Sequence, residues 1–302
     1  MELEEAAEEM KKKGIKRVFV QLPEGLKTKS LEVADFLEKN GLEPIISLEN
    51  TYGACDLRDE EALRLKCDAI LHLGHNEFGF EWVKSKIPVF YVEWFSNKTG
   101  NDSLEKIVEA LKDFEKIGIV YSIQYKKAFE NVVEFLRSNN KKVFVSRSGQ
   151  IIGCNFSNAL SIEKDVEAFL VVSAGKFHAI GIALNVKKPV FVFDVETNDV
   201  QKIEVNRYSK IKAWNKKIFE DSKNVGLLVS WKKGQIKDFE LVKKKIESLG
   251  KKVYVLVFDE LNESILEGLK IDCLINLACP RISVDDLERY KIPIIDYTDV
   301  LF

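Results

Sequence analysis

Lys86-Ile87-Pro88-Val89-Phe90-Tyr91-Val92 sets the architecture of the chain, because two similar stretches follow it. Each opens with lysine and proline and continues as a short β-prone run. The other two occupy residues 187–193 and 291–295. Recurrence at such spacing indicates an internal repeat of one supersecondary unit. The sequence therefore predicts that one structural block is used three times.

The three blocks contain the same order of short apolar runs, with an amphipathic helix after the first run of each. The predicted strands are 15–20, 44–48, 69–75 and 87–92, then 117–121, 143–145, 169–175 and 188–193, then 225–229, 253–258, 273–277 and 292–295. This alternation is typical of parallel sheets covered on both faces. We expect an α/β protein of three similar small parallel-sheet domains, an internal threefold repeat around a central cleft.

The predicted domains are 1–100, 101–212 and 213–302, with linkers near 96–102 and 198–214. A formal charge of −2 gives no electrostatic reason to expect nucleic acid as a partner. No apolar run reaches the ~20 residues that a membrane-spanning helix needs, and residues 1–13 do not have the pattern of a signal peptide. We therefore expect a soluble cytoplasmic protein without a membrane partner.

Three cysteines lie in turns that follow predicted strands: Cys55 in Thr51-Tyr52-Gly53-Ala54-Cys55-Asp56, Cys154 in Gly153-Cys154-Asn155, and Cys279 in Ala278-Cys279-Pro280-Arg281. Ligands of open parallel sheets bind beyond the carboxyl ends of the strands. Three converging thiolates could hold an iron-sulfur cluster with one iron left open, or zinc with an open position. Unrelated buried cysteines are an equally serious alternative. Cys67 and Cys273 are interpreted as ordinary buried cysteines.

Other candidate site residues lie beside these turns or at neighbouring strand ends. His72 and His75 flank the end of a strand, where a substrate contact and a simply packed histidine are both open. Gly175 and His178 lie where a helix begins, so that backbone amides there could bind a carboxylate. Arg281 could grip a carboxylate with two hydrogen bonds, or form a surface salt bridge.

The segment Gln21-Leu22-Pro23-Glu24-Gly25-Leu26 joins the first strand to the first helix, a place where nucleosides often bind. It lacks the GxGxxG fingerprint, so a plain connecting turn is equally consistent with it. Gln21 and Gly25, together with Gln150 before the Cys154 turn, complete the set expected to line the cleft.

Six motifs, taken in order, resemble the archaeal diphthamide synthesis family, the 2-(3-amino-3-carboxypropyl)histidine synthases. They are the 21–26 segment, the three cysteine turns, His72-Leu73-Gly74-His75 and Gly175-Lys176-Phe177-His178, and they cover nearly the whole chain. The resemblance implies three related α/β domains that each give one cysteine to a 4Fe-4S cluster, with Cys55, Cys154 and Cys279 as the ligands.

The resemblance also implies a reaction. S-adenosylmethionine would be cleaved between sulfur and the methionine γ-carbon, and the 3-amino-3-carboxypropyl group transferred to a histidine of translation elongation factor 2, with methylthioadenosine as the other product. Such an enzyme differs from ordinary radical S-adenosylmethionine enzymes, whose CxxxCxxC loop is absent here. A homodimer and an external electron donor are further implied.

Two other functions remain open. A quinolinate-synthase-like 4Fe-4S dehydratase also uses three α/β domains with one cluster cysteine each, but its motifs fit less well. A non-catalytic electron-transfer partner subunit is the other alternative. The presence of all three candidate cysteines argues against it.

Overall fold

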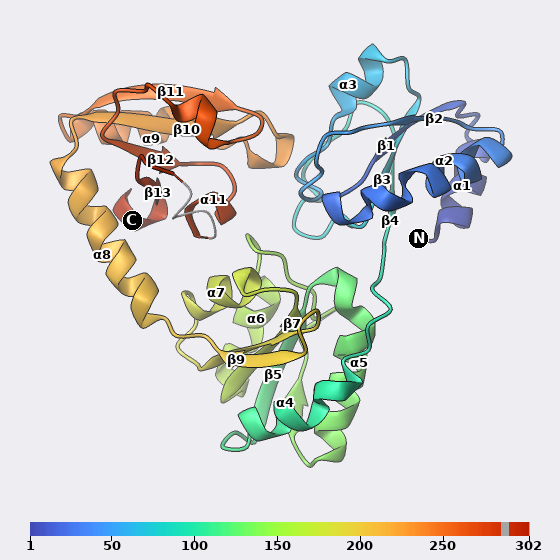
Figure 1. Cartoon of the computed structure of the whole chain (residues 1–302), viewed down its shortest axis with the longest axis horizontal. Helices are drawn as coiled ribbons and strands as arrows, with labels where there is room; N and C mark the ends of the chain where they lie inside the picture. The colour runs from blue at the N-terminus through green and yellow to red at the C-terminus, as the bar shows by residue number, and fades with distance from the viewer. Residues whose placement is uncertain (285–289, 302) are drawn as a thin grey trace. The chain divides into compact units, whose positions relative to one another are not determined.

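The computed structural model describes residues 1–284 and 290–301, and these residues form three separate β-sheets (Figure 1). All neighbouring strands in them are parallel except β8 and β9. Helices pack on both faces of each sheet. The predicted α/β class with parallel sheets is confirmed.

The first sheet has the order β2-β1-β3-β4, and in register Val20 lies between Ile46 and Leu71. Apolar residues of α1 and α2 cover one face, and α3 covers the other. The strands are β1 (Arg17–Gln21), β2 (Glu43–Ile46), β3 (Ala69–Leu73) and β4 (Val89–Val92). The helices are α1 (Leu3–Lys12), the 3-10 helix η1 (Glu24–Lys29), α2 (Ser30–Lys39) and α3 (Asp59–Arg64).

Helix α2 shows how local sequence produces this layer. Val33, Ala34 and Leu37 are spaced to lie on one face and are buried there. The helix ends because Gly41 adopts a φ of +76°, which lets the amide of Leu42 bond the carbonyl of Leu37. The chain then turns directly into β2.

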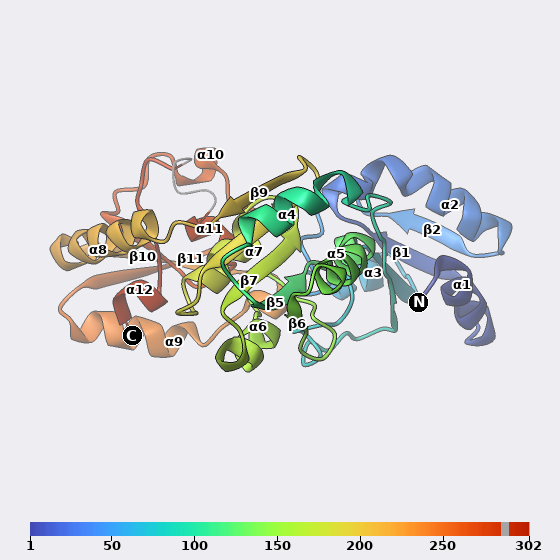
Figure 2. The same ribbon diagram turned by 90° about the horizontal axis from the view of Figure 1, so that it is seen from below.

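The second sheet has the order β6-β5-β7-β8-β9, with α4 and α5 on one face and α6 and α7 on the other, as can be followed in Figure 2. Its strands are β5 (Lys116–Tyr121), β6 (Lys142–Phe144), β7 (Ala168–Ser173), β8 (Val190–Asp194) and β9 (Asp199–Lys202). Its helices are η2 (Asn101–Ser103), α4 (Leu104–Ala110), η3 (Ile123–Tyr125), α5 (Lys126–Ser138), α6 (Ser157–Ile162), η4 (Glu163–Asp165) and α7 (Phe177–Ala183).

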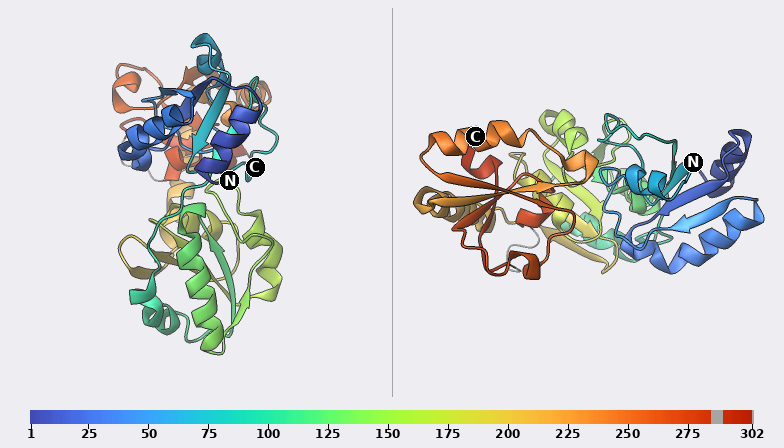
Figure 3. Two further views of the ribbon diagram at one scale, coloured as in Figure 1. Left: turned by 90° about the vertical axis from the view of Figure 1, so that its right-hand side faces the viewer. Right: turned by 90° about the horizontal axis from the view of Figure 1, so that it is seen from above.

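The third sheet, coloured orange to red in Figure 3, has the order β11-β10-β12-β13. Apolar residues of α8, α9 and α12 cover one face, and α10 packs on the other. Its strands are β10 (Asn224–Ser230), β11 (Lys252–Phe258), β12 (Cys273–Asn276) and β13 (Ile294–Asp296). Its helices are α8 (Asn206–Asp221), η5 (Lys233–Gln235), α9 (Phe239–Ser248), α10 (Glu263–Leu266), α11 (Arg281–Val284) and α12 (Thr298–Leu301).

Each sheet therefore places its first strand between its second and third strands, with the fourth beyond the third. One region departs from the sequence expectation. Residues 198–214, predicted as a linker, contain β9, which pairs antiparallel with β8, and the first half of α8. Among the residues that the structure describes, no helix is long and apolar enough to span a bilayer.

The chain divides into two compact units. The first contains residues 1–97 together with Lys232–Gly234, and the second contains 98–231 and 235–302. The first sheet lies in one unit, and the second and third sheets lie in the other. The three predicted domain ranges stay a prediction.

Two leucines of α2 provide a matched test of the core. Leu37 is fully buried, whereas Leu31 is 71% exposed. Leu37→Ala should lower the free energy of unfolding by about 2–5 kcal/mol, because it removes buried methyl groups and leaves a cavity. Leu31→Ala should change it by less than about 0.5 kcal/mol. Urea titration followed by circular dichroism measures both, and equal effects of the two substitutions would contradict this packing.

Candidate functional site

The Cys55 turn lies between β2 and α3 and is anchored from beneath by Gln21, at the end of β1. The Gln21 side chain is fully buried. Its amide donates to the carbonyl of Asp56 at 2.9 Å, and its oxygen accepts from the amide of Arg58 at 3.1 Å. Gln21 therefore supports the Cys55 turn through the backbone of the turn, and its predicted contact with cofactor stays a prediction.

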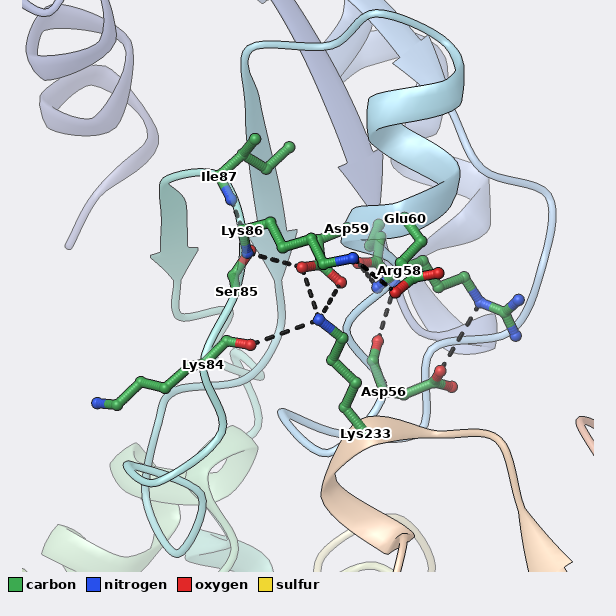
Figure 4. A network of polar contacts seen from close by, with 10 residues as sticks. Asp56, Arg58, Asp59, Glu60, Lys84, Ser85, Lys86, Ile87 and Lys233 are labelled. Carbon is green, nitrogen blue, oxygen red and sulfur yellow. Dashed lines mark hydrogen bonds and ion pairs between the residues drawn. The ribbon is translucent and has the colours of Figure 1, made fainter.

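Two buried carboxylates follow Cys55 (Figure 4). Burial raises the pKa of Asp56 in spite of the nearby cations Lys232 and Arg58. Burial also acts to raise the pKa of Asp59, but hydrogen bonds from Lys233 and from the amide of Lys86 prevail and lower it. The turn is thus set in a charged, partly desolvated environment.

His72 and His75 converge after the end of β3. Nε2 of His72 lies 3.1 Å from Nδ1 of His75, and the ring of His72 also packs against Tyr91. Burial lowers the pKa of His72, with a further contribution from His75, and lowers that of His75 to about 4. Nδ1 of His72 is buried without a hydrogen-bond partner among residues 1–284 and 290–301. Both rings are therefore neutral at pH 7.

Gly25 lies in the 3-10 helix η1, away from this turn's hydrogen bonds. A β-carbon at Gly25 would meet no atom within 4 Å. Close packing therefore does not require a glycine there, and its predicted contact with cofactor remains a prediction.

In the second unit, the Cys154 turn follows β6 and is closed by backbone hydrogen bonds between Ile152 and Asn155. Asn158, 2% exposed, donates from its side chain to the carbonyl of Gln150 at 2.7 Å. The backbone of Gln150 also extends the second sheet by bridging Tyr121. Gln150 thus connects β5 to the Cys154 turn.

The Cys279 turn follows β12 and is anchored by Asn276, which is fully buried. The Asn276 side chain donates to the carbonyl of Cys279 at 2.9 Å and accepts from the amide of Ala278 at 2.9 Å. This arrangement matches that of Gln21 and the Cys55 turn. In all three turns, a buried carboxamide side chain bonds the backbone near the cysteine.

Cys154 and Cys279 lie within electrostatic range of each other. Burial of its thiol, with a contribution from Cys279, raises the pKa of Cys154 to about 11, although the residue as a whole is exposed. Lys237 faces both cysteines and Asp296, and burial lowers the pKa of its ammonium. Its Nζ also lies 4.6 Å from the centre of the Tyr297 ring. The Lys237 ammonium therefore lies within electrostatic range of two cysteines that could become thiolates.

Arg281 and His178 belong to the same side of this unit. The guanidinium carbon of Arg281 lies 5.7 Å from the centre of the Phe177 ring, at the start of α7. Burial, and secondarily Arg281, lowers the pKa of His178 to about 4. Phe177 also packs so tightly on Gly153 that a β-carbon there would come within 1.8 Å of the ring. Phe177 therefore links the Cys154 turn to Arg281.

Gly175 adopts a φ of +64°, and its amide donates to a carboxylate oxygen of Asp194 at 2.9 Å. This amide was predicted to be available to a substrate carboxylate, but it already has an acidic partner. Arg281 remains the stronger of the two candidates for that role.

The structure thus brings Cys154, Cys279, His178 and Arg281 together in one unit, and places Cys55, Gln21 and His75 in the other. Within the described ranges, no three His, Cys, Asp or Glu side chains gather closely enough to hold a metal ion. Convergence of all three cysteines stays a prediction.

Sequence reasoning missed the lysines of the site, Lys232, Lys233 and Lys237, as well as Asn158 and Asn276. The three lysines look like ordinary surface residues in a lysine-rich chain. Their position just after the buried strand β10 was the available signal, because strand ends carry sites in parallel sheets.

The neutral histidines predict a loss of stability in mild acid. Unfolded histidine has a pKa of about 6.5, so below that pH the unfolded state takes up protons that folded His178, with a pKa of about 4, does not. At pH 5 this should lower the free energy of unfolding by up to about 2 kcal/mol for His178. Melting temperatures of the wild type and His178→Gln between pH 7 and pH 5 measure the effect. A variant that loses as much stability as the wild type would contradict a buried neutral His178.

Known proteins of one family are similar to this chain over nearly its whole length. The family model for diphthamide synthesis proteins matches residues 22–301. The 2-(3-amino-3-carboxypropyl)histidine synthase of Pyrococcus horikoshii is 32% identical, over 98% of this chain and 88% of its own. That of Methanocaldococcus jannaschii is 30% identical, over 92% and 81%.

A solved structure, Dph2 from Pyrococcus horikoshii with a 4Fe-4S cluster, superposes with a TM-score of 0.88 at 30% identity. It covers 98% of this chain and 88% of that one. The chain therefore belongs to the diphthamide synthesis protein family, and the relatives that it matches are transferases named 2-(3-amino-3-carboxypropyl)histidine synthase.

Proposed function

We propose that this protein is a 2-(3-amino-3-carboxypropyl)histidine synthase that uses S-adenosylmethionine to modify one histidine of translation elongation factor 2, the first step of diphthamide biosynthesis. The observation that carries the proposal is the shared construction of the three cysteine turns. Each has a buried carboxamide bonded to its backbone, in a chain that superposes on a cluster-containing relative over 98% of its length.

Cys55, Cys154 and Cys279 would hold a 4Fe-4S cluster. The residues fit such a group, because Cys154 and Cys279 lie close together and Lys237 can balance the negative charge of their thiolates. Binding to iron would deprotonate the Cys154 thiol, which burial otherwise keeps protonated at pH 7 by raising its pKa to about 11. When bound and reduced by an external electron donor, the cluster supplies an electron and an open coordination position.

The chain's own residues would position the substrate. Arg281 is suited to the methionine carboxylate, because its guanidinium can donate two parallel hydrogen bonds. Its stacking near Phe177 fixes its direction. His178, neutral at pH 7, would add no repelling charge beside a sulfonium substrate. The net transfer would be redox-neutral. The aminocarboxypropyl group replaces the hydrogen on the imidazole carbon between the two nitrogens, that hydrogen leaves as a proton, and the electron supplied at the start is returned.

The arrangement at larger scale is part of the same proposal. The three sheets would descend from one repeated unit, which the shared order of their first four strands supports. They would surround a central cleft that shields the reaction from water. The protein would act as a homodimer in the cytoplasm, where elongation factor 2 works.

The reaction can be tested directly. Anaerobically reconstituted protein should transfer label from carboxyl-labelled S-adenosylmethionine to archaeal elongation factor 2 and release methylthioadenosine. Cys55→Ala, Cys154→Ala and Cys279→Ala should each lose iron and activity, because two remaining thiolates hold a cluster poorly. Cys67→Ala and Cys273→Ala are the controls and should keep both. Release of 5′-deoxyadenosine and methionine instead would refute the proposed reaction.

The role of Arg281 can be tested separately. Arg281→Ala should weaken S-adenosylmethionine binding about tenfold or more through loss of a charged hydrogen-bonding partner, while iron content stays at the wild-type level. Arg137→Ala, on the exposed end of α5, is the matched control and should change neither quantity. Isothermal titration calorimetry measures the affinity. Wild-type affinity in Arg281→Ala would remove this residue from the site.

A further inference from the structure

Lys232–Gly234 is a short segment that we call the strap. It directly follows Trp231 and β10, yet it groups with the first compact unit, while the residues on both sides of it belong to the second. The amide of Gly234 donates to the carbonyl of Cys55 at 2.8 Å. A segment almost 180 residues later in the chain thus bonds directly to the backbone of a candidate cluster ligand.

The contact is too close for any residue but glycine. A β-carbon on Gly234 would lie 2.5 Å from the α-carbon and 2.6 Å from the β-carbon of Cys55, and 3.0 Å from the ring of Phe80. The first two are atoms at the backbone, which cannot turn aside as a flexible side-chain end can. The position of Cys55 is therefore set by direct packing of one backbone on another.

Two lysines of the strap form ion pairs with carboxylates that follow Cys55. Nζ of Lys233 lies 2.6 and 2.7 Å from the two carboxylate oxygens of Asp59, which is fully buried (Figure 4). Nζ of Lys232 lies 3.3 Å from the carboxylate of Asp56, and both of these side chains are less than 5% exposed. Lys232 also lies 5.5 Å from the centre of the Tyr52 ring.

Burying two such ion pairs is a poor way to gain stability alone, because well-packed apolar residues often serve equally well. Ion pairs do fix position, since each buried charge must stay beside its partner. Asp56 and Asp59 follow Cys55 by one and four residues. The charges therefore fix the strap against the part of the turn that carries the thiol.

We propose that the Lys232–Gly234 strap is a positioning device for the Cys55 thiol, and that it presents Cys55 as a ligand of the cluster. The use of Cys55 as a ligand rests on the proposed function. The strap's restraint of the Cys55 turn is a property of the protein without cluster. Lys232, Lys233 and Gly234 are positioning residues, and the thiol of Cys55 is the group they act on.

Gly234→Ala tests the backbone contact in the full-length protein. In protein without cluster, iodoacetamide should alkylate Cys55 about tenfold faster than in the wild type, because the strap is forced off the turn and Cys55, 8% exposed, is uncovered. Peptide mass spectrometry measures the alkylation rate of Cys55 and compares it with those of two other cysteines. Cys154 is exposed, and Cys67 is buried in the same unit as Cys55. After reconstitution, the variant should bind less iron per chain and show an altered electron paramagnetic resonance spectrum.

Lys233→Gln and Lys233→Arg test the charges of the strap. If Cys67 becomes reactive in Gly234→Ala, the first unit has unfolded in that variant, and the Lys233 variants then decide the test. Lys233→Gln should raise Cys55 alkylation and lower iron content, and Lys233→Arg should restore both, because it keeps the charge. Lys29→Met is the control, since its ion pair with Glu32 is exposed.

Two failures can be told apart. Unchanged Cys55 alkylation in both Gly234→Ala and Lys233→Gln overturns the strap proposal. A wild-type protein that binds no iron overturns the proposed function instead, and the alkylation result still decides whether the strap restrains Cys55.

Discussion

The site depends on three hydrogen-bonded carboxamides. A turn beyond the end of a parallel strand leaves backbone groups that neither the sheet nor a helix can satisfy, and each such group is costly if it is also shielded from water. Gln21, Asn158 and Asn276 solve this problem in the three sheets by bonding carbonyl or amide groups of the cysteine turns. Each of these side chains belongs to an adjacent strand or helix. Its hydrogen bond therefore fixes the turn relative to the sheet.

Charge is the second constraint. A cluster held by thiolates brings negative charge into a partly desolvated place, and such charge needs cations at short range. Lys237 faces Cys154 and Cys279, and Lys232 lies beside the carboxylate that follows Cys55. Lys232 is 6% exposed, so solvent screens its charge less than that of a lysine on an outer helix face. The two units thus use the same means, a lysine ammonium near a cysteine turn, although Lys232 is buried and Lys237 is exposed.

Much of the fold could be predicted from the sequence, because β-branched runs with lysine and proline before them mark strands locally. β9 and α8 were missed, since β9 is short and polar and α8 has a weak apolar face that leaves Trp214 exposed. The cysteines could be chosen from their places at strand ends. Lys233 could not, because its partner Asp59 lies 174 residues earlier, and no local pattern distinguishes a lysine that will be buried from one that stays in solvent.

The position of the strap in the chain also governs how the protein can be made. Residues 1–97 leave the ribosome well before Lys232, and at ~5–20 residues per second the intervening 134 residues take on the order of 10 s to synthesise. During that time Asp56 and Asp59 have no lysine of the strap beside them, and the support of the turn within residues 1–97 comes from partners such as Gln21. The first unit becomes complete only late in translation, when most of the remaining chain has already emerged.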